Sequence, residues 1–181
     1  MTELSLNILD ISQNSVKAGA DTINITLTET EETLEFVIKD NGCGMDEETV
    51  NSVTNPFYTT RTTRNVGLGV PLLKLAAEQT GGDIEINSVT KEQDPLIHGT
   101  ELKALFYKNH IDFTPLGDII SSVVTMIQGA PDIRWSFVHT APGKEVTLFT
   151  DELKAVLGDI PLDNAEVITW IKEYLKESYS N

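Results

Sequence analysis

The chain has 181 residues, of which 40% are apolar and 23% charged, a composition typical of a soluble globular protein with one domain or one domain and an appendage. Its 13 basic and 28 acidic side chains give a net charge of −15, which argues against nucleic acid as the main partner because phosphate binding needs a basic face. The single cysteine excludes an internal disulfide and a multi-cysteine metal site. There is no apolar run of membrane-spanning length and no basic region of a signal peptide at the start, so we expect a cytoplasmic protein that does not enter the membrane.

Periodicity predicts alternating helices and strands in the first part of the chain. Leu4, Ile8 and Ile11 recur at helical spacing, and two runs with a period of two follow, joined by an acidic turn typical of a hairpin. The expected elements are a helix over 2–18, strands over 22–28 and 33–39, a short helix and a long loop within 45–66, a helix over 70–79, and strands over 84–89 and 100–107.

The last third of the chain has a different pattern, and we place a boundary between residues 108 and 109. The expected elements are a helix over 115–128, a hairpin of strands 133–139 and 145–150, and helices over 151–157 and 164–176. Trp135 and Trp170 fall on these patterns where core packing is expected. The apolar residues of the last two helices, Val156 among them, are expected to share one face.

Two glycine clusters suggest a ligand site. Asp40, Gly42 and Gly44 follow a strand, where a carboxylate can accept a hydrogen bond from an exocyclic amine and glycines let the backbone approach a flat ligand. The plain alternative is an Asn-Gly turn. The segment 67–69, Gly-Leu-Gly, opens a helix, where backbone N–H groups suit phosphate, although ordinary loop glycines have the same pattern.

One face of the first helix is polar. Asp10, Asn14 and Lys17 stand at positions i, i+4 and i+7, which places them on one side of a helix. A carboxylate, an amide and an ammonium group together could orient a water molecule, hold Mg²⁺ through the amide oxygen and neutralise phosphate. A solvated helix face is the alternative. A Walker loop and a complete dinucleotide fingerprint are both absent from the sequence.

Taken in order, these pieces resemble the GHKL superfamily of ATP-binding domains, shared by DNA gyrase, heat-shock chaperones, mismatch-repair MutL and sensor histidine kinases. The matching pieces are Asp10-x-x-x-Asn14-x-x-Lys17, Asp40-x-Gly42-x-Gly44, a Thr-rich loop, Gly67-x-Gly69 and Gly99-Thr100. Residues 55–61 followed by 67–70 are especially similar to the histidine kinase branch. The resemblance covers residues 3–107. It implies an α+β fold, a two-layer α/β sandwich with a Bergerat-type mixed sheet and helices on one face, followed here by a small αββαα extension.

The resemblance also implies a role for each matching residue. Asn14 would coordinate Mg²⁺ with Lys17 close by, and Asp40 would recognise adenine. The further assignments are Gly42, Gly44 and Met45 beside the base, Thr100 supporting the adenine end, Thr60, Arg61 and Arg64 of a lid over 46–66 reaching the phosphates, and Gly67, Leu68 and Gly69 binding the phosphates through backbone N–H groups.

Asp10 departs from the family pattern, because hydrolytic members carry Glu four residues before the Asn. Asp is one methylene shorter, and a displacement of about 1 Å can cost on the order of 10²-fold in rate, so we expect slow turnover if Asp10 is the catalytic base. The phosphoacceptor helix pair of a sensor kinase has no counterpart in the sequence, so a stand-alone form is expected.

Three functions stay open at this point. The first is Mg²⁺-dependent ATP binding with slow hydrolysis or regulatory use of ATP. The second is a protein kinase resembling anti-sigma or histidine kinases, in which Asp10 would help a partner's hydroxyl or imidazole attack the γ-phosphate. The third is a non-catalytic module that binds ATP or ADP. Residues 109–181 would bind a protein partner or form a homodimer. Cys43 is expected as a small buried filler, with redox sensing as the alternative.

Overall fold

The structure, a computed structural model, describes residues 3–55 and 69–181. Six helices and six strands form within these ranges, in the order α1 (Leu4–Lys17), β1 (Thr22–Glu29), β2 (Thr33–Asp40), α2 (Glu47–Thr54), α3 (Gly69–Gln79), β3 (Asp83–Val89), β4 (Gly99–Tyr107), α4 (Ile119–Gly129), β5 (Arg134–Ala141), β6 (Lys144–Phe149), α5 (Thr150–Leu157) and α6 (Ala165–Ser180). None of the helices in the described ranges is long and apolar enough to cross a membrane.

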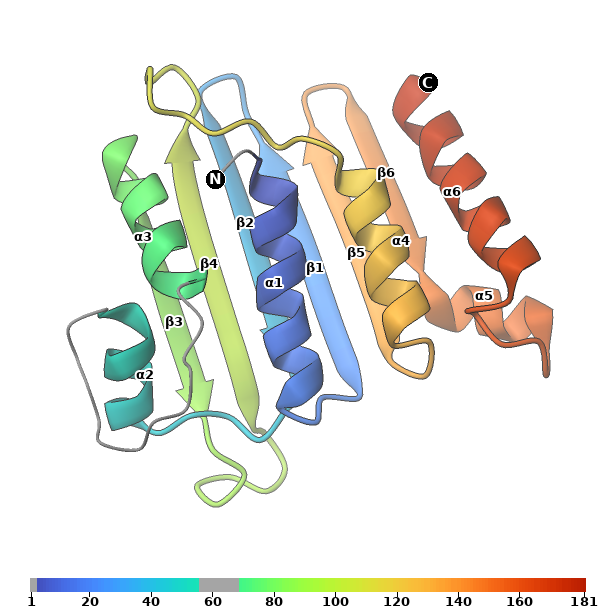
Figure 1. Cartoon of the computed structure of the whole chain (residues 1–181), viewed down its shortest axis with the longest axis horizontal. Helices are drawn as coiled ribbons and strands as arrows, with labels where there is room; N and C mark the ends of the chain where they lie inside the picture. Colours follow the sequence, from blue (N-terminus) through green and yellow to red (C-terminus); the bar gives the residue numbers. More distant parts are fainter. Residues whose placement is uncertain (1–2, 56–68) are drawn as a thin grey trace.

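The strands form one mixed sheet in the order β3-β4-β2-β1-β5-β6, and α1, α3 and α4 lie across the same face of it (Figure 1). Every neighbouring pair is antiparallel except β1 and β5, which are parallel. This arrangement confirms the expected α+β fold with a mixed sheet and helices on one face.

The period of two in the strands decides which side chains the helices cover. In β2, Leu34, Phe36 and Ile38 are buried, and Ile38 stands in register with Ile25 on one side and Leu102 on the other. Of the alternate positions, which face away, Thr33, Glu35 and Lys39 are polar, and ion pairs such as Lys39–Glu101 form on the open face. One apolar and one polar side of a sheet produce the two-layer architecture, because only the apolar side needs helices over it.

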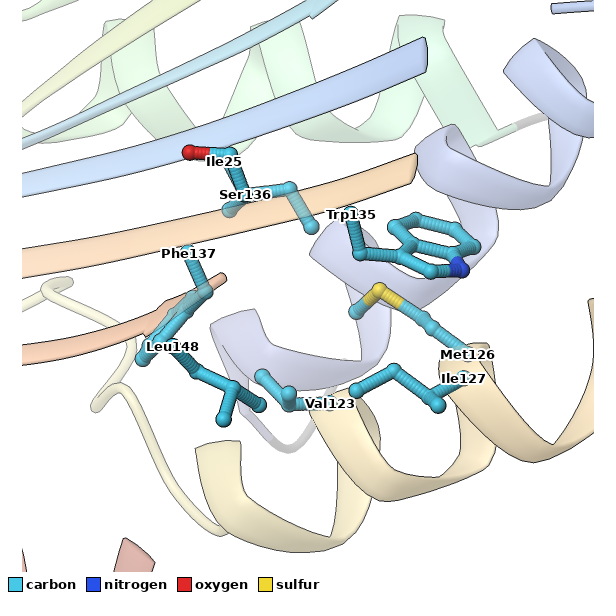
Figure 2. A pocket seen from close by; sticks show the side chains of 8 residues that line it. All are labelled: Ile25, Val123, Met126, Ile127, Trp135, Ser136, Phe137 and Leu148. Atoms are coloured by element: carbon cyan, nitrogen blue, oxygen red, sulfur yellow. The ribbon is translucent and has the colours of Figure 1, made fainter. Parts of the chain in front are cut away.

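The C-terminal third shares this sheet. Strand β5 pairs with β1 along its length, with Ile25 opposite Phe137, and α4 packs beside α1. Figure 2 shows the apolar layer between α4 and strands β5 and β6, where Val123 and Ile127 face Phe137 and Leu148. The void enclosed there is about 10 Å³, the size of a packing defect. The division at residues 108 and 109 stays a prediction.

Two helix boundaries in this region differ from the expectation. Helix α4 begins only after Asp118, whose carboxylate accepts hydrogen bonds from Ser121 N at 3.0 Å and Ser121 Oγ at 2.6 Å as an N-cap. The carbonyls of Pro115 and Leu116 instead accept hydrogen bonds from the first N–H groups of α1. Helix α6 continues to Ser180, four residues beyond the predicted end, because its last turn has tertiary contacts.

Those contacts form a cluster that connects α6 to the middle of the sheet. His139 on β5 is buried, with Nδ1 at 2.7 Å from the Tyr179 hydroxyl and Nε2 at 2.8 Å from Glu29 Oε1 on β1. Lys108 Nζ donates to the other Glu29 oxygen at 2.9 Å, and Lys144 Nζ donates to the Tyr179 carbonyl. Burial and the Glu29 charge raise the pKa of the Tyr179 hydroxyl. The hydroxyl therefore keeps its proton, and its hydrogen bond with His139 Nδ1, together with the contact between His139 Nε2 and Glu29, holds the imidazole ring in place.

Candidate functional site

A cavity of about 410 Å³ opens between α1 and the β2, β3 and β4 side of the sheet, a size typical of small-molecule sites. Its described lining includes polar groups, which are Asp10, Asn14, Ser15, Lys17, Asp40, Cys43 and Thr100. Its apolar walls and floor are Ile11, Ile38, Met45, Val53, Val70, Ile86 and Leu102, with Ala18 and Gly44 completing the described lining. An apolar slot with a few convergent polar groups suits a flat heterocycle that carries a polar edge.

Asp40 ends β2 and is the most buried acid in the cavity, at 9% exposure. Its Oδ1 accepts hydrogen bonds from Gly42 N at 2.9 Å and Thr100 N at 3.2 Å, and its Oδ2 accepts one from Ser15 Oγ at 2.6 Å. A carboxylate offers about four lone-pair positions. The described residues use three, so Oδ2 can accept one more hydrogen bond from a donor in the cavity.

The loop after Asp40 is held close to its neighbours by contacts that only glycine allows. A Cβ on Gly42 would lie 2.9 Å from Ala18 Cβ, and a Cβ on Gly44 would lie 1.9 Å from the Val89 carbonyl oxygen. Gly44 also has φ +73, in the left-handed region that favours glycine. His98 Nδ1 lies 2.5 Å from the Gly42 carbonyl oxygen. The glycines therefore allow close approaches within the chain, and their approach to a flat ligand stays a prediction.

Ser88 joins three segments at the edge of the cavity. Its hydroxyl accepts a hydrogen bond from Met45 N at 2.7 Å and lies 2.8 Å from Thr100 Oγ1 and 3.1 Å from the Gly99 carbonyl oxygen. Gly99 has φ +133, and a Cβ there would lie 1.9 Å from the Asp40 carbonyl oxygen. Ser88 therefore fixes Met45 and Thr100, two residues predicted to lie beside the base.

The polar face of α1 lines the cavity as its spacing predicts. Asp10, Asn14 and Lys17 are exposed toward it, whereas Leu4 and Ile8 on the opposite face are fully buried. The helix α3 begins against this face, because a Cβ on Gly69 would lie 2.2 Å from Asp10 Oδ2. Among the described residues, the side-chain amide of Asn14 has no hydrogen-bond partner, so its oxygen is available to a ligand.

Most of the predicted site residues that the structure describes lie at the cavity. Its lining includes Asp10, Asn14, Lys17, Asp40, Gly44, Met45 and Thr100. Gly42 is hydrogen-bonded to Asp40, and Gly69 lies against Asp10. The predictions for Thr60, Arg61, Arg64, Gly67 and Leu68 lie outside the described residues.

Sequence reasoning missed two serines and misplaced one cysteine. Ser15 is buried because it lies four residues after Ile11, on the core face of α1. Ser88 lies on the same face of β3 as Ile84 and Ile86. A serine at an apolar position of the pattern is a signal that could have found both. Cys43 is exposed, which overturns its interpretation as buried filler, because Cys43 N donates to the Ala18 carbonyl and its side chain is left outside the core.

The chain matches the family described as histidine kinase-, DNA gyrase B- and HSP90-like ATPase over residues 2–114, and it belongs to that family. It is 30% identical over 103 residues to a putative sensor protein of Shewanella frigidimarina, covering 55% of this chain and 15% of that protein. It is 34% identical over 90 residues to the sensor histidine kinase YvrG of Bacillus subtilis, covering 48% of this chain and 14% of that protein. The chain thus spans a small part of these relatives.

Solved structures agree on the fold. The ATPase domain of Aquifex aeolicus MutL, complexed with ADP, superposes with a TM-score of 0.55 at 11% identity, covering 96% of this chain and 88% of that one. The N-terminal domain of a DNA repair protein superposes with a TM-score of 0.55 at 18% identity, covering 82% of this chain and 52% of that one. At these identities the similarity shows the fold alone.

Proposed function

We propose that the chain binds ATP with Mg²⁺ in the 410 Å³ cavity, in the cytoplasm, and hydrolyses it slowly or uses it as a regulatory ligand. One observation carries this proposal. Asp40 is buried, lines the cavity with one acceptor position that no described residue uses, and lies among apolar walls that include Ile38, Ile86 and Leu102. Adenine has an exocyclic amine that can donate to that lone pair and two flat faces that can pack between the walls.

The polar end of the cavity suits the phosphates and a magnesium ion. Within the described residues no group of three His, Cys, Asp or Glu side chains is placed to hold a metal, so protein ligands alone do not form a metal cage there. Mg²⁺ in nucleotide sites uses one or two protein oxygens together with phosphates and water. The Asn14 amide oxygen, free of described partners, and the Asp10 carboxylate on the same helix face fit that pattern, and Lys17 adds a positive charge. The ion would neutralise phosphate charge when bound.

Titration calorimetry with ATP, ADP and GTP, each with and without Mg²⁺, tests the proposal. We expect ATP and ADP to bind, Mg²⁺ to strengthen ATP binding, and GTP to bind at least about tenfold more weakly, because guanine carries a carbonyl where adenine carries the amine. The loss of a hydrogen bond to a charged group, about 1.5–3 kcal/mol, corresponds to this ratio. GTP binding as tightly as ATP would contradict recognition by Asp40.

Phosphoryl transfer to a partner protein is the second candidate, favoured by the similarity to a sensor histidine kinase. In hydrolysis, Asp10 would orient a water molecule; in transfer, it would orient a hydroxyl or imidazole of the partner. Incubation with γ-labelled ATP and cell lysate separates the two, since only transfer labels a protein. Phosphate release by Asp10→Ala compared with the unmodified chain separates hydrolysis from a non-catalytic module. Equal release would exclude Asp10 as the base.

A further inference from the structure

A groove of about 490 Å³ is lined by α5, α6 and the segment between them. These helices lie at the β6 end of the sheet, whereas α2 lies at the β3 end (Figure 1), and the groove shares no described lining residue with the candidate nucleotide site. The lining includes Leu153, Val156, Leu157, Ile160, Val167 and Trp170. The groove is therefore separate from the candidate nucleotide site, and the proposed function gives it no role.

Three of the lining side chains are exposed although they are apolar. Val156 is 87% exposed, Trp170 52% and Ile160 49%. The exposed fraction of Trp170 overturns the expectation that this side chain packs in the core. Helix α6 instead buries Val167 and Ile171 and leaves Trp170 on its groove side. Contiguous apolar exposure of this kind marks an interaction surface.

The Trp170 ring in the groove is held in place by contacts within the chain. The Trp170 ring stacks on Tyr174 with centroids 5.3 Å apart and an interplanar angle of 9°. The Tyr174 hydroxyl in turn donates to the Thr147 carbonyl of β6 at 2.9 Å. Since the indole is held in place before binding, little side-chain entropy is lost when it contacts a partner.

The charges around the groove are mainly acidic. Glu166 lines it, and three more acids are chain neighbours of lining residues: Glu152, Asp159 and Asp163. None of the four has an ion-pair partner among residues 3–55 and 69–181. One base, Lys154, is also a chain neighbour of a lining residue; its Nζ donates to the Asp132 carbonyl at 3.3 Å and keeps its charge, so the four acids outnumber it, and Arg134 pairs with Asp151. Lys172 follows Trp170 by two positions, on the other side of α6, and acts on Asp118.

We propose that this groove binds one amphipathic helix of a partner protein, with large apolar side chains on the face that enters the groove and lysine or arginine on both sides of that face. A helix presents apolar anchors at i, i+3, i+4 and i+7 to such grooves. Charge selects the occupant: a basic helix complements the four carboxylates, whereas a second copy of this acidic chain would place like charges opposite one another, which is unfavourable.

Two designed peptides of 14 residues test the proposal. Both carry Leu at the a and d positions of two heptads; the first has Lys at all other positions and the second has Glu. A scrambled Leu–Lys peptide without helical periodicity is the control for charge alone. Emission from Trp170 reports docking, because the only other tryptophan, Trp135, is buried. We expect the periodic Leu–Lys peptide to bind and shift the emission to shorter wavelength, and the scrambled and Leu–Glu peptides to bind at least about tenfold more weakly.

Variants locate the binding. Val156→Ser is expected to weaken the Leu–Lys peptide at least about tenfold, as removal of a central apolar contact does. Ile111→Ser, at a residue that is 95% exposed outside the groove, is the matched control and should leave binding unchanged. Asp163→Lys combined with Glu166→Lys should move the preference to the Leu–Glu peptide, with circular dichroism checking that the fold is kept. The proposal is overturned if Val156→Ser binds as tightly as the unmodified chain, if the double variant keeps its preference for Leu–Lys, or if the groove instead mediates a dimer that Val156→Ser dissociates.

Discussion

The carboxylate of Asp40 is surrounded by protein donors and keeps one acceptor position open. Ser15, Gly42 and Thr100 orient it from α1, from its own loop and from β4. A carboxylate held in this way cannot turn to follow a ligand, so its direction selects which edge of a base fits. Selection by a fixed acceptor depends on the residues behind Asp40 as much as on Asp40 itself.

Ser88 provides a residue-scale prediction about this support. Ser88→Ala removes the acceptor of Met45 N and the partner of the Thr100 hydroxyl, so we expect a loss of stability of about 1–3 kcal/mol. ATP affinity should fall as well, since Met45 and Thr100 lie at the cavity. Thermal melting and calorimetry measure both. Ser52→Ala is the control, because that hydroxyl donates only to the Thr49 carbonyl within α2. Equal effects of the two substitutions would show that Ser88 has no positioning role.

Individual residues were predictable from sequence where a repeated spacing or a motif marked them. The spacing of Asp10, Asn14 and Lys17 was sufficient to place all three on one face of α1. Ser88 is marked only as a serine at an apolar position of its strand. Its partners could not be predicted, because they depend on the pairing of β3 with β4, which sets Ser88 opposite Thr100. Pairing between strands is a long-range property that local patterns do not contain.

At the scale of elements, the loop between β2 and α2 depends on the backbone of Gly44. Two kinds of constraint act there: a positive φ and the close Val89 carbonyl. Gly143, in the turn between β5 and β6, has the same φ of +73, and a Cβ added there would have nothing within 4 Å of it. A comparison of substitutions at the two glycines therefore separates the effect of backbone strain from the effect of close packing.

We expect Gly143→Ala to cost about 1–2 kcal/mol of stability, the strain of a left-handed alanine, and to leave ATP affinity unchanged. Gly44→Ala has the same strain and must also displace the loop from Val89, so both stability and ATP affinity should fall further. Denaturant unfolding and calorimetry on the two variants measure the difference. Identical results for both would mean that the close approach at Gly44 contributes nothing to the site.

Element types followed from periodicity, whereas some element ends did not. The strands and α1 formed close to the predicted positions because each has one apolar face. Helix α4 begins late because Pro115 and Leu116 bond to α1. Helix α6 runs on because Tyr179 reaches His139, which in turn contacts Glu29. In both cases the end of the helix is decided by a partner that lies far away in the sequence.

At the scale of the whole molecule, the Glu29 side chain connects segments that lie far apart in the sequence. This side chain links β1 to β5 through His139 and to the residue after β4 through Lys108. Burial raises the pKa of the Glu29 carboxyl, but the hydrogen bonds from Lys108 and His139 outweigh it, and the pKa is lowered overall. A lowered pKa means that the ionised carboxylate stabilises the fold at pH values above the ordinary pKa of 4.5, and that this contribution is lost as the pH falls below it.

Glu29→Gln is therefore expected to cost about 1.5–3 kcal/mol at pH 7, the contribution of hydrogen bonds to a charged group, and to make stability less sensitive to pH below 4.5. Glu35→Gln is the control, because its pair with Lys103, 3.5 Å away, lies on the open face of the sheet and should contribute less than about 1 kcal/mol. Urea unfolding between pH 3 and 8 measures both variants. A parallel pH profile for Glu29→Gln and the unmodified chain would contradict this role.

The central claim is that Asp40 accepts a hydrogen bond from the amine of adenine. The most direct measurement is calorimetry with ATP and with purine riboside triphosphate, which lacks that amine, on the unmodified chain and on Asp40→Asn. We predict that loss of the amine weakens binding to the unmodified chain about tenfold or more, while Asp40→Asn binds both nucleotides equally weakly. If the unmodified chain binds the two nucleotides with the same affinity, Asp40 does not recognise adenine and the account is wrong.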